Sequence, residues 1–315
     1  MKLGTLLGLV VCNLIWSANP TMAKFVMKSV SPAHAVWLRY ASALAAYALA
    51  VPLLRAFYGG RRFAGPMFVR GGSGPDRAWI LALGLLTFVL SPLLQMSGLS
   101  VSRAVDGALV VAMEPLIAVL FAAVLLREPL GPRHLLGFAL ALTGFSLLSG
   151  LTPQRMLTGF DAHAFGNLLL LLSLAGEGAY SAVGRKLVSR HPPGALFASA
   201  LLIGVLVLTA VIFLRSGPPP FSALGTSGVL AVLWLGPLGT AFGYLYWMAA
   251  LREAPVASVA LTLFIQPVMG TVWGRIFLDE RLTLVQGAGA LLILLSLASE
   301  VLFDRASVRD AAPTV

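Results

Sequence analysis

The sequence has few charged residues and few of the side chains that bind metals or form disulfides. Only 11% of its 315 residues are Asp, Glu, Lys or Arg, whereas soluble domains carry about a quarter. Cys12 is the only cysteine, which excludes an intrachain disulfide. The four histidines are scattered at the ends of apolar runs or between them, so no metal site and no cofactor is expected. A P-loop is missing too, which argues against an ATP-driven pump.

Hydrophobic residues, in contrast, make up 58% of the chain, and the mean hydropathy is +0.91. A soluble protein with this composition could not cover its own surface, so the composition predicts a polytopic membrane protein whose main partner is the lipid bilayer. The 22 Lys and Arg against 12 Asp and Glu could suggest nucleic-acid binding. These basic residues fall between the apolar runs, as in cytoplasmic loops, so nucleic acid is not expected as a partner.

Apolar windows of about 20 residues predict ten membrane-spanning helices. They lie near 3–23, 34–54, 78–98, 105–125, 134–150, 164–184, 195–214, 227–249, 256–274 and 284–303. The first run has no small-residue cleavage site and is interpreted as a span rather than a signal peptide. With the N-terminus inside, 14 Lys and Arg fall on the cytoplasmic side and 7 on the other. This bias predicts that both termini are cytoplasmic.

The two halves of the chain resemble each other. Residues 93–149 align without a gap to the residues 152 positions further on, and 12 of the 57 pairs are identical. The informative matches are Pro115 with Pro267 and Glu128 with Glu280. We therefore predict an all-α membrane fold of ten helices in two inverted five-helix repeats around a central cavity, as in many transporters. The repeats are residues 1–150 and 160–304, and residues 305–315 form a cytoplasmic tail.

Several motifs are similar to those of a known family. The segment LIWSANP at 14–20 resembles the first span of an EamA domain, and EPL at 114–116 and QPV at 266–268 resemble its fourth span. The resemblance is to the drug/metabolite transporter superfamily and covers nearly the whole chain. It implies the ten-helix fold above and the export of small metabolites. The second repeat departs from the pattern at 176–180, where a Trp-containing stretch often occurs.

Two carboxyl groups fall well inside predicted spans, Glu114 in the fourth and Glu177 in the sixth. An ionised group at the bilayer centre costs at least ~2.5–3.5 kcal/mol on insertion scales. Such residues usually have a function, although a protonated Glu that bonds a neighbouring helix is the alternative. We expect both to contribute to substrate or proton binding.

Polar and aromatic side chains recur at helical spacing near these carboxyl groups. The expected pocket comprises Asn13, Trp16, Ser17, Gln95, Tyr180, Gln266 and Trp273. Close helix packing is the alternative role for the Ser residue. Arg39 is the only cation clearly inside a span. It lies near an end to which it could snorkel, but we also count it among the candidate substrate-binding residues, because it could meet a substrate carboxylate. The lack of core cations favours neutral or amine-bearing substrates over phosphorylated ones.

These features predict a secondary transporter, an exporter of small neutral or amine-bearing metabolites such as amino acids, that works by alternating access. Proton coupling and exchange are both open, and an uncoupled facilitator or a non-transporting scaffold is the alternative. An intramembrane enzyme is not expected. Pro20, Pro115 and Pro267 are the expected gating bends. The expected location is the bacterial inner membrane, and the sequence leaves substrate identity, direction and oligomeric state open.

Overall fold

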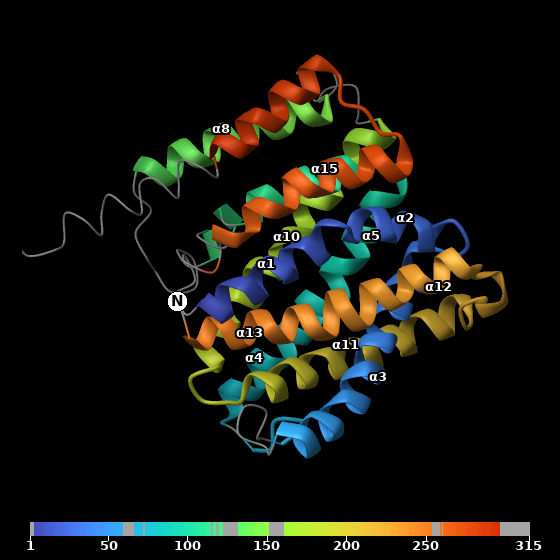
Figure 1. The fold of residues 1–315 in the computed structure, drawn as a ribbon, viewed down its shortest axis with the longest axis vertical. Coiled ribbons are helices and arrows are strands. Elements are labelled where there is room, and N and C mark those ends of the chain that lie inside the picture. The colour runs from blue at the N-terminus through green and yellow to red at the C-terminus, as the bar shows by residue number, and fades with distance from the viewer. Residues whose placement is uncertain are drawn as a thin grey trace, which may run out of the picture.

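The computed structural model describes residues 3–58, 66–71, 73–114, 116–117, 120–121, 132–150, 161–253, 259 and 261–296. Within these residues the regular structure is helical, without β-strands (Figure 1). Pro115, Glu128 and the tail 305–315 lie outside the described residues.

The helices of the first half follow the expected spans, although much of the fourth expected span, 105–125, lies outside the described residues. They are α1 (Leu3–Ser17), α2 (Asn19–Met27), α3 (Pro32–Tyr58), α4 (Gly74–Leu85), the π-helical η1 (Leu86–Leu90), α5 (Ser91–Val101), α6 (Ala104–Val110), the 3₁₀ turn η2 (Val111–Met113) and α8 (Pro132–Ser149). The segments α4, η1 and α5 form one continuous span, Gly74–Val101.

The second half has a similar series of helices. Its elements are α10 (Ala162–Leu187), α11 (Pro193–Ser216), the short η3 (Phe221–Ala223), α12 (Thr226–Leu233), the π-helical η4 (Trp234–Phe242), α13 (Gly243–Glu253), the 3₁₀ turn η5 (Leu261–Phe264), α15 (Ile265–Leu278) and a last helix, Leu284–Ser296. Five of the described helices are both long and apolar enough to cross a bilayer: Leu3–Met27, Pro32–Pro52, Gly74–Val101, Pro193–Ser216 and Thr226–Glu253.

Prolines explain why several spans depart from regular α-helix. The first span breaks at Ala18, two residues before Pro20, which occupies the first turn of α2. In the third span, Pro92 follows η1, and the amide of Ser91 bonds the carbonyl of Leu86 five residues back. Pro237 lies inside η4 in the eighth span. Because proline clashes with the carbonyl four residues earlier, a π-helical turn relieves the strain within a continuous helix.

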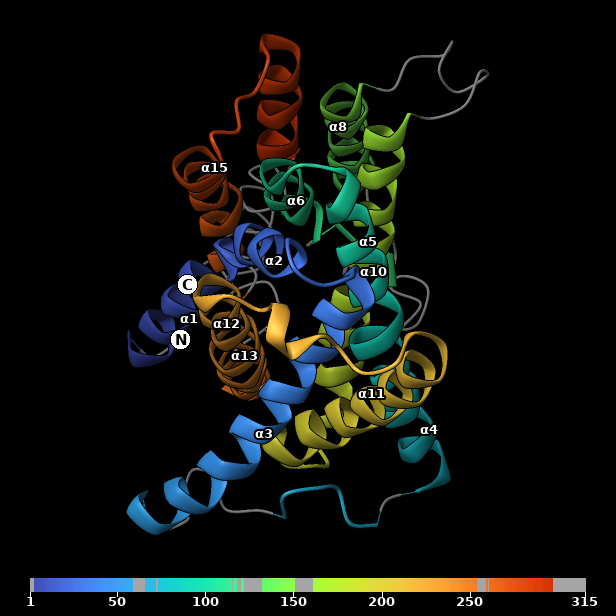
Figure 2. The same ribbon diagram turned by 90° about the vertical axis from the view of Figure 1, so that its right-hand side faces the viewer.

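The two halves pack against each other in a reciprocal way. The third span of the first half crosses the second span of the other half, where a Cβ at Gly84 would lie 2.9 Å from the carbonyl oxygen of Ala200. The eighth span makes the matching crossing with α3, where a Cβ at Gly236 would lie 2.7 Å from the carbonyl oxygen of Arg39. Such close crossings of small residues are typical of membrane helices. Figure 2 shows α3 and α11 on the same side of the bundle, with α10 and α5 beside each other.

The fifth span and the last helix form a pair at the edge of the bundle (Figure 1). They cross at two glycines. A Cβ on Gly144 would lie 2.6 Å from the carbonyl oxygen of Gly289, and a Cβ on Gly289 would lie 2.6 Å from the carbonyl oxygen of Gly144. Leu142 and Leu291 are exposed on this pair, as expected for side chains that face lipid.

Candidate functional site

A cavity of about 70 Å³ lies in the middle of the bundle, several times the ~10–15 Å³ that one water needs. Helices of both halves line it, namely α1, α2, α3, α5, α6, α10, α13 and α15. Its polar lining consists of Ser17, Asn19, Arg39, Gln95, Glu114, Ser173, Glu177, Ser181 and Gln266. The cavity therefore lies between the two halves of the chain, and inverted-repeat transporters bind their substrates at such an interface.

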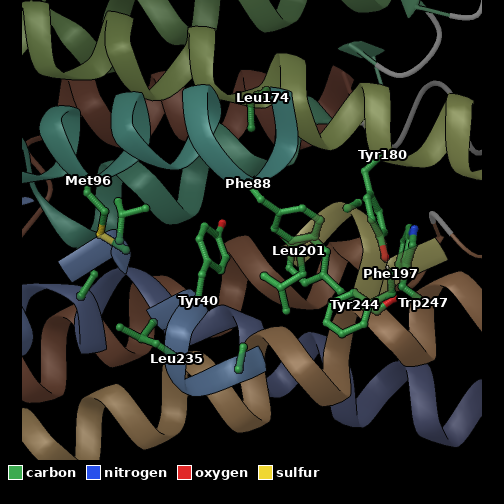
Figure 3. Close-up of a cluster of buried hydrophobic side chains, with 14 of the residues drawn as sticks. Tyr40, Phe88, Met96, Leu174, Tyr180, Phe197, Leu201, Leu235, Tyr244 and Trp247 are labelled. Carbon is green, nitrogen blue, oxygen red and sulfur yellow. Dashed lines mark hydrogen bonds between the residues drawn. The ribbon is translucent and has the colours of Figure 1, made fainter. Parts of the chain in front are cut away.

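Aromatic rings form one wall of this cavity. Tyr180 and Tyr244 pack edge to face with centroids 5.1 Å apart, and Trp16 contacts the rings of Tyr244 and Trp247 at 5.6 and 5.5 Å. Phe88 extends the cluster behind Tyr244, at 5.7 Å (Figure 3). Edge-to-face pairs of this kind hold the rings in fixed orientations. The wall is therefore rigid, and its ring faces can accept a cationic group.

Arg39 is part of the cavity rather than of the membrane interface. Its side chain is only 4% exposed, its Nε donates to Thr240 Oγ1 at 2.9 Å, and Nη1 donates to Gln95 Oε1 at 3.4 Å. The guanidinium also lies over the ring of Tyr40, 5.3 Å from its centroid. Of the two positions that the sequence leaves open for Arg39, the structure has the one at the cavity, because Thr240 on the eighth span and Gln95 on the third span hold its guanidinium there. Because Arg39 places a positive charge at the cavity, the lack of core cations no longer argues against phosphorylated substrates.

Glu114 and Glu177 both face the cavity, from the fourth and sixth spans, and lie close enough to interact electrostatically. The hydroxyl of Tyr244 donates to Glu177 Oε1 at 2.5 Å, and the hydroxyl of Tyr180 donates to the carbonyl of Tyr244 at 3.2 Å. Two carboxylates that share a poorly solvated site repel each other when both are ionised. The pair is therefore suited to exchange a proton for a cationic group.

A second layer of hydrogen bonds supports the first span. Gln266 Nε2 donates to Asn13 Oδ1, and Asn13 Nδ2 donates to Thr262 Oγ1, both at 2.8 Å. Trp273 Nε1 donates to Ser17 Oγ at 2.9 Å. These bonds satisfy the buried amides and join α1 to α15 across the two halves.

The structure brings together most of the side chains expected from the sequence. Those that line the cavity are Glu114, Glu177, Trp16, Ser17, Gln95, Tyr180, Gln266 and Arg39, and Pro20 lines it as well. Asn13 and Trp273 stand behind the lining and bond to Gln266 and Ser17. Pro267 is buried in the first turn of α15, directly after the 3₁₀ turn η5. Their roles in binding and gating stay predictions.

Thr240 was not expected in the site, although it orients Arg39. It lies in the π-helical segment of the eighth span, four residues before Tyr244 and seven before Trp247. Helical spacing with these two cavity residues is the signal that could have found it. Asn19 was also missed: it lines the cavity, and its buried Oδ1 accepts no hydrogen bond from the described residues.

Comparisons with known proteins give a consistent result. The model of the EamA-like transporter family matches residues 3–150 and again residues 164–299. An uncharacterized transporter of Archaeoglobus fulgidus is 26% identical over 300 residues, which covers 94% of this chain and 98% of the relative. A protein of Streptantibioticus cattleyicolor named "probable terminal-alkyne amino-acid exporter" is 25% identical over 228 residues, 71% of this chain and 74% of that one.

The chain also resembles a protein of known crystal structure. The TM-score is 0.66 at 20% sequence identity, with 97% of this chain and 98% of the other covered. At this identity the likeness concerns the fold alone. Together with the family match it confirms the expected all-α integral membrane fold of ten helices.

Proposed function

Because this chain belongs to the EamA-like transporter family, we propose that it exports small amine-bearing metabolites, amino acids among them, by alternating access. The observation that carries this proposal is the pair Glu114 and Glu177 facing one buried cavity between the two halves. A substrate ammonium would meet these carboxyl groups, the Oδ1 of Asn19 and the aromatic wall. The name of the Streptantibioticus relative supports the same substrate class.

Arg39 adds a positive pole to the site. Thr240 and Gln95 hold its guanidinium at the cavity, so a substrate carboxylate could bind there while the amine binds at Glu177. A cavity with poles of both signs suits a zwitterion better than an amine alone.

We further propose that transport is coupled to protons or to exchange through the Glu114–Glu177 pair. Once the amine has left, a proton would bind to the carboxyl pair and neutralise its charge. The empty carrier would then change between its two conformations with a neutral pair. The excess of basic residues in alternate loops supports cytoplasmic termini.

A panel of three matched solutes in proteoliposomes tests the substrate class. The panel consists of an amino acid, its amide, which keeps the amine, and the carboxylic acid that lacks the amine. We expect counterflow of the amino acid, slower counterflow of the amide and none of the acid. Movement of the carboxylic acid alone would contradict the proposal, and a folded protein that moves nothing would favour a non-transporting scaffold.

A further inference from the structure

One end of the bundle is held together by polar contacts that the cavity does not use. The loop between α15 and the last helix lies against the first turn of α6, where the Glu280 carboxylate accepts hydrogen bonds from the amides of Ala104 at 2.9 Å and Val105 at 2.8 Å. The first amides of a helix have no partner within it, and their partial positive charge favours an anion. A side chain of the second half thus caps a helix of the first half.

Buried Asp106, in the same turn of α6, forms the centre of these contacts. Its carboxylate accepts from Arg103 Nη2 at 2.6 Å and Nε at 3.0 Å, and it lies 2.6 Å from His163 Nε2. Arg103 also donates to the carbonyl of Arg281 at 2.9 Å and to Gln286 Oε1 at 3.2 Å. The guanidinium therefore bridges α6 and the loop that carries Glu280.

The first span joins the same group of contacts through Lys24, whose Nζ donates to the carbonyl of Ser102 at 2.5 Å. We call this group the clasp and define it as Lys24, Arg103, Asp106, His163 and Glu280. Its members come from α2, from α6 and the residue before it, from α10 and from the loop after α15. In Figure 2, α2, α6 and α15 lie next to one another.

The clasp lies between the cavity and this end of the bundle. Ala23, directly before Lys24, lines the cavity, and so do Gly107 and Ala108, directly after Asp106. A path from the cavity to this face would have to part α2, α6 and α15. Parting them would break the hydrogen bonds of Glu280 and Lys24.

From this arrangement we propose that the clasp is the gate at this end of the carrier and that Glu280 is its latch. The inference rests on the proposed transport function, since only a carrier has to open this end. Because several charge-assisted bonds must break together, the closed state is favoured until a bound solute or the other half shifts the balance.

Thiol labelling tests the gate without any substrate. In a Cys12→Ala background, Ala23→Cys places a thiol on the cavity wall next to the clasp. A membrane-impermeant maleimide is added to one face of sealed vesicles at a time, and an exposed Ser222→Cys, in the loop between α11 and α12, identifies the clasp face. That loop lies at the clasp end of the bundle. The carbonyl of Gly217, at the end of α11, is 3.2 Å from the ring of His34, and His34 is in the first turn of α3, which follows α2 and its Lys24.

We expect Glu280→Gln to accelerate labelling of the Ala23→Cys thiol from the clasp face by about tenfold or more, because hydrogen bonds to a charged group are lost. Asp279→Asn is the matched control. Asp279 is the neighbouring carboxylate, exposed and paired with Arg275, and its positive φ of 51° is one that Asn tolerates. The control should label like the parent.

An unchanged labelling rate in Glu280→Gln, or equal acceleration in Asp279→Asn, would overturn the gate. Should Glu280→Gln fail to fold, Arg103→Lys replaces it, since Lys keeps the charge but cannot reach Asp106 and Gln286 together. A protein that opens as expected but moves no solute would contradict the proposed function and leave the clasp standing.

Discussion

At the scale of single residues, the site depends on a guanidinium that two neighbours hold in one direction. Arg39 reaches Thr240 and Gln95 from the first third of α3, and both partners belong to other spans. A buried charge of this kind is retained at a cost, since a cation inside the hydrocarbon is expensive, and a role in recognition explains it best.

Arg39→Lys is expected to weaken transport of amino acids about tenfold or more, seen as a higher KM, because Lys keeps the charge but loses the planar fork that pairs with a carboxylate. Transport of the matched amide, which lacks the carboxylate, should change little. Arg215→Lys, at the exposed end of α11, is the control and should behave like the parent. An equal loss for both solutes would mean that Arg39 is structural.

Residue types and spacing pointed to Glu114 and Glu177 as cavity residues but left the position of Arg39 open between the cavity and the membrane interface. Glu114 and Glu177 lie so deep in apolar runs that no helix end is within reach. Arg39 lies seven residues after the start of α3, a distance from which a long side chain could reach the interface. Its direction is set by Thr240, 201 positions away, and no local pattern contains that contact.

At the scale of elements, the paired glycines of the fifth span and the last helix make a sharp comparison possible. Gly289→Ala would place a Cβ 2.6 Å from the Gly144 carbonyl oxygen and 2.8 Å from the amide of Leu148, and backbone atoms cannot easily move away. We expect destabilisation of about 1–3 kcal/mol, measured by thermal unfolding in detergent.

Gly287→Ala is the control for this change, since it lies on the same helix with nothing within 4 Å of its new Cβ. Ala is a better helix former than Gly by about 0.5–1 kcal/mol, so this variant should gain stability. Equal behaviour of the two variants would contradict the close crossing of α8 and Leu284–Ser296.

The positions of the spans were predictable to within a few residues, because apolar runs report them directly. The π-helical turns η1 and η4 were not predicted, although Pro92 and Pro237 mark both. A proline inside a span predicts some distortion but does not say whether the helix kinks, breaks or widens. The structure shows widening at these two positions and a break before Pro20.

At the scale of the whole molecule, two halves that share a sequence pattern enclose a site that is not symmetric. Glu114 precedes the proline of the first half, and Gln266 stands at the matching position of the second. Arg39 belongs to α3, and its counterpart at the matching crossing of α11 is Ala200. The repeat could be found in the sequence, whereas the clasp could not, because Glu280 and Ala104 are 176 positions apart.

This asymmetry underlies the proposed coupling through the Glu114–Glu177 pair. Both ionisable carboxyl groups face the same cavity. In the proposed coupling, a cationic group and a proton would therefore compete for binding to this pair. In the proposed mechanism, the two similar halves would rock between two conformations, and the unequal side chains would provide the chemistry.

The most direct test is a flux measurement in proteoliposomes, with and without a pH gradient, using the amino acid that the parent transports best. In Glu114→Gln and Glu177→Gln we expect the stimulation by the gradient to disappear, because the pair can no longer exchange its proton. Glu253→Gln, at an exposed carboxylate bonded to Thr5, should retain it. If Glu114→Gln and Glu177→Gln both transport normally and with unchanged pH dependence, the proposed coupling through this pair is wrong.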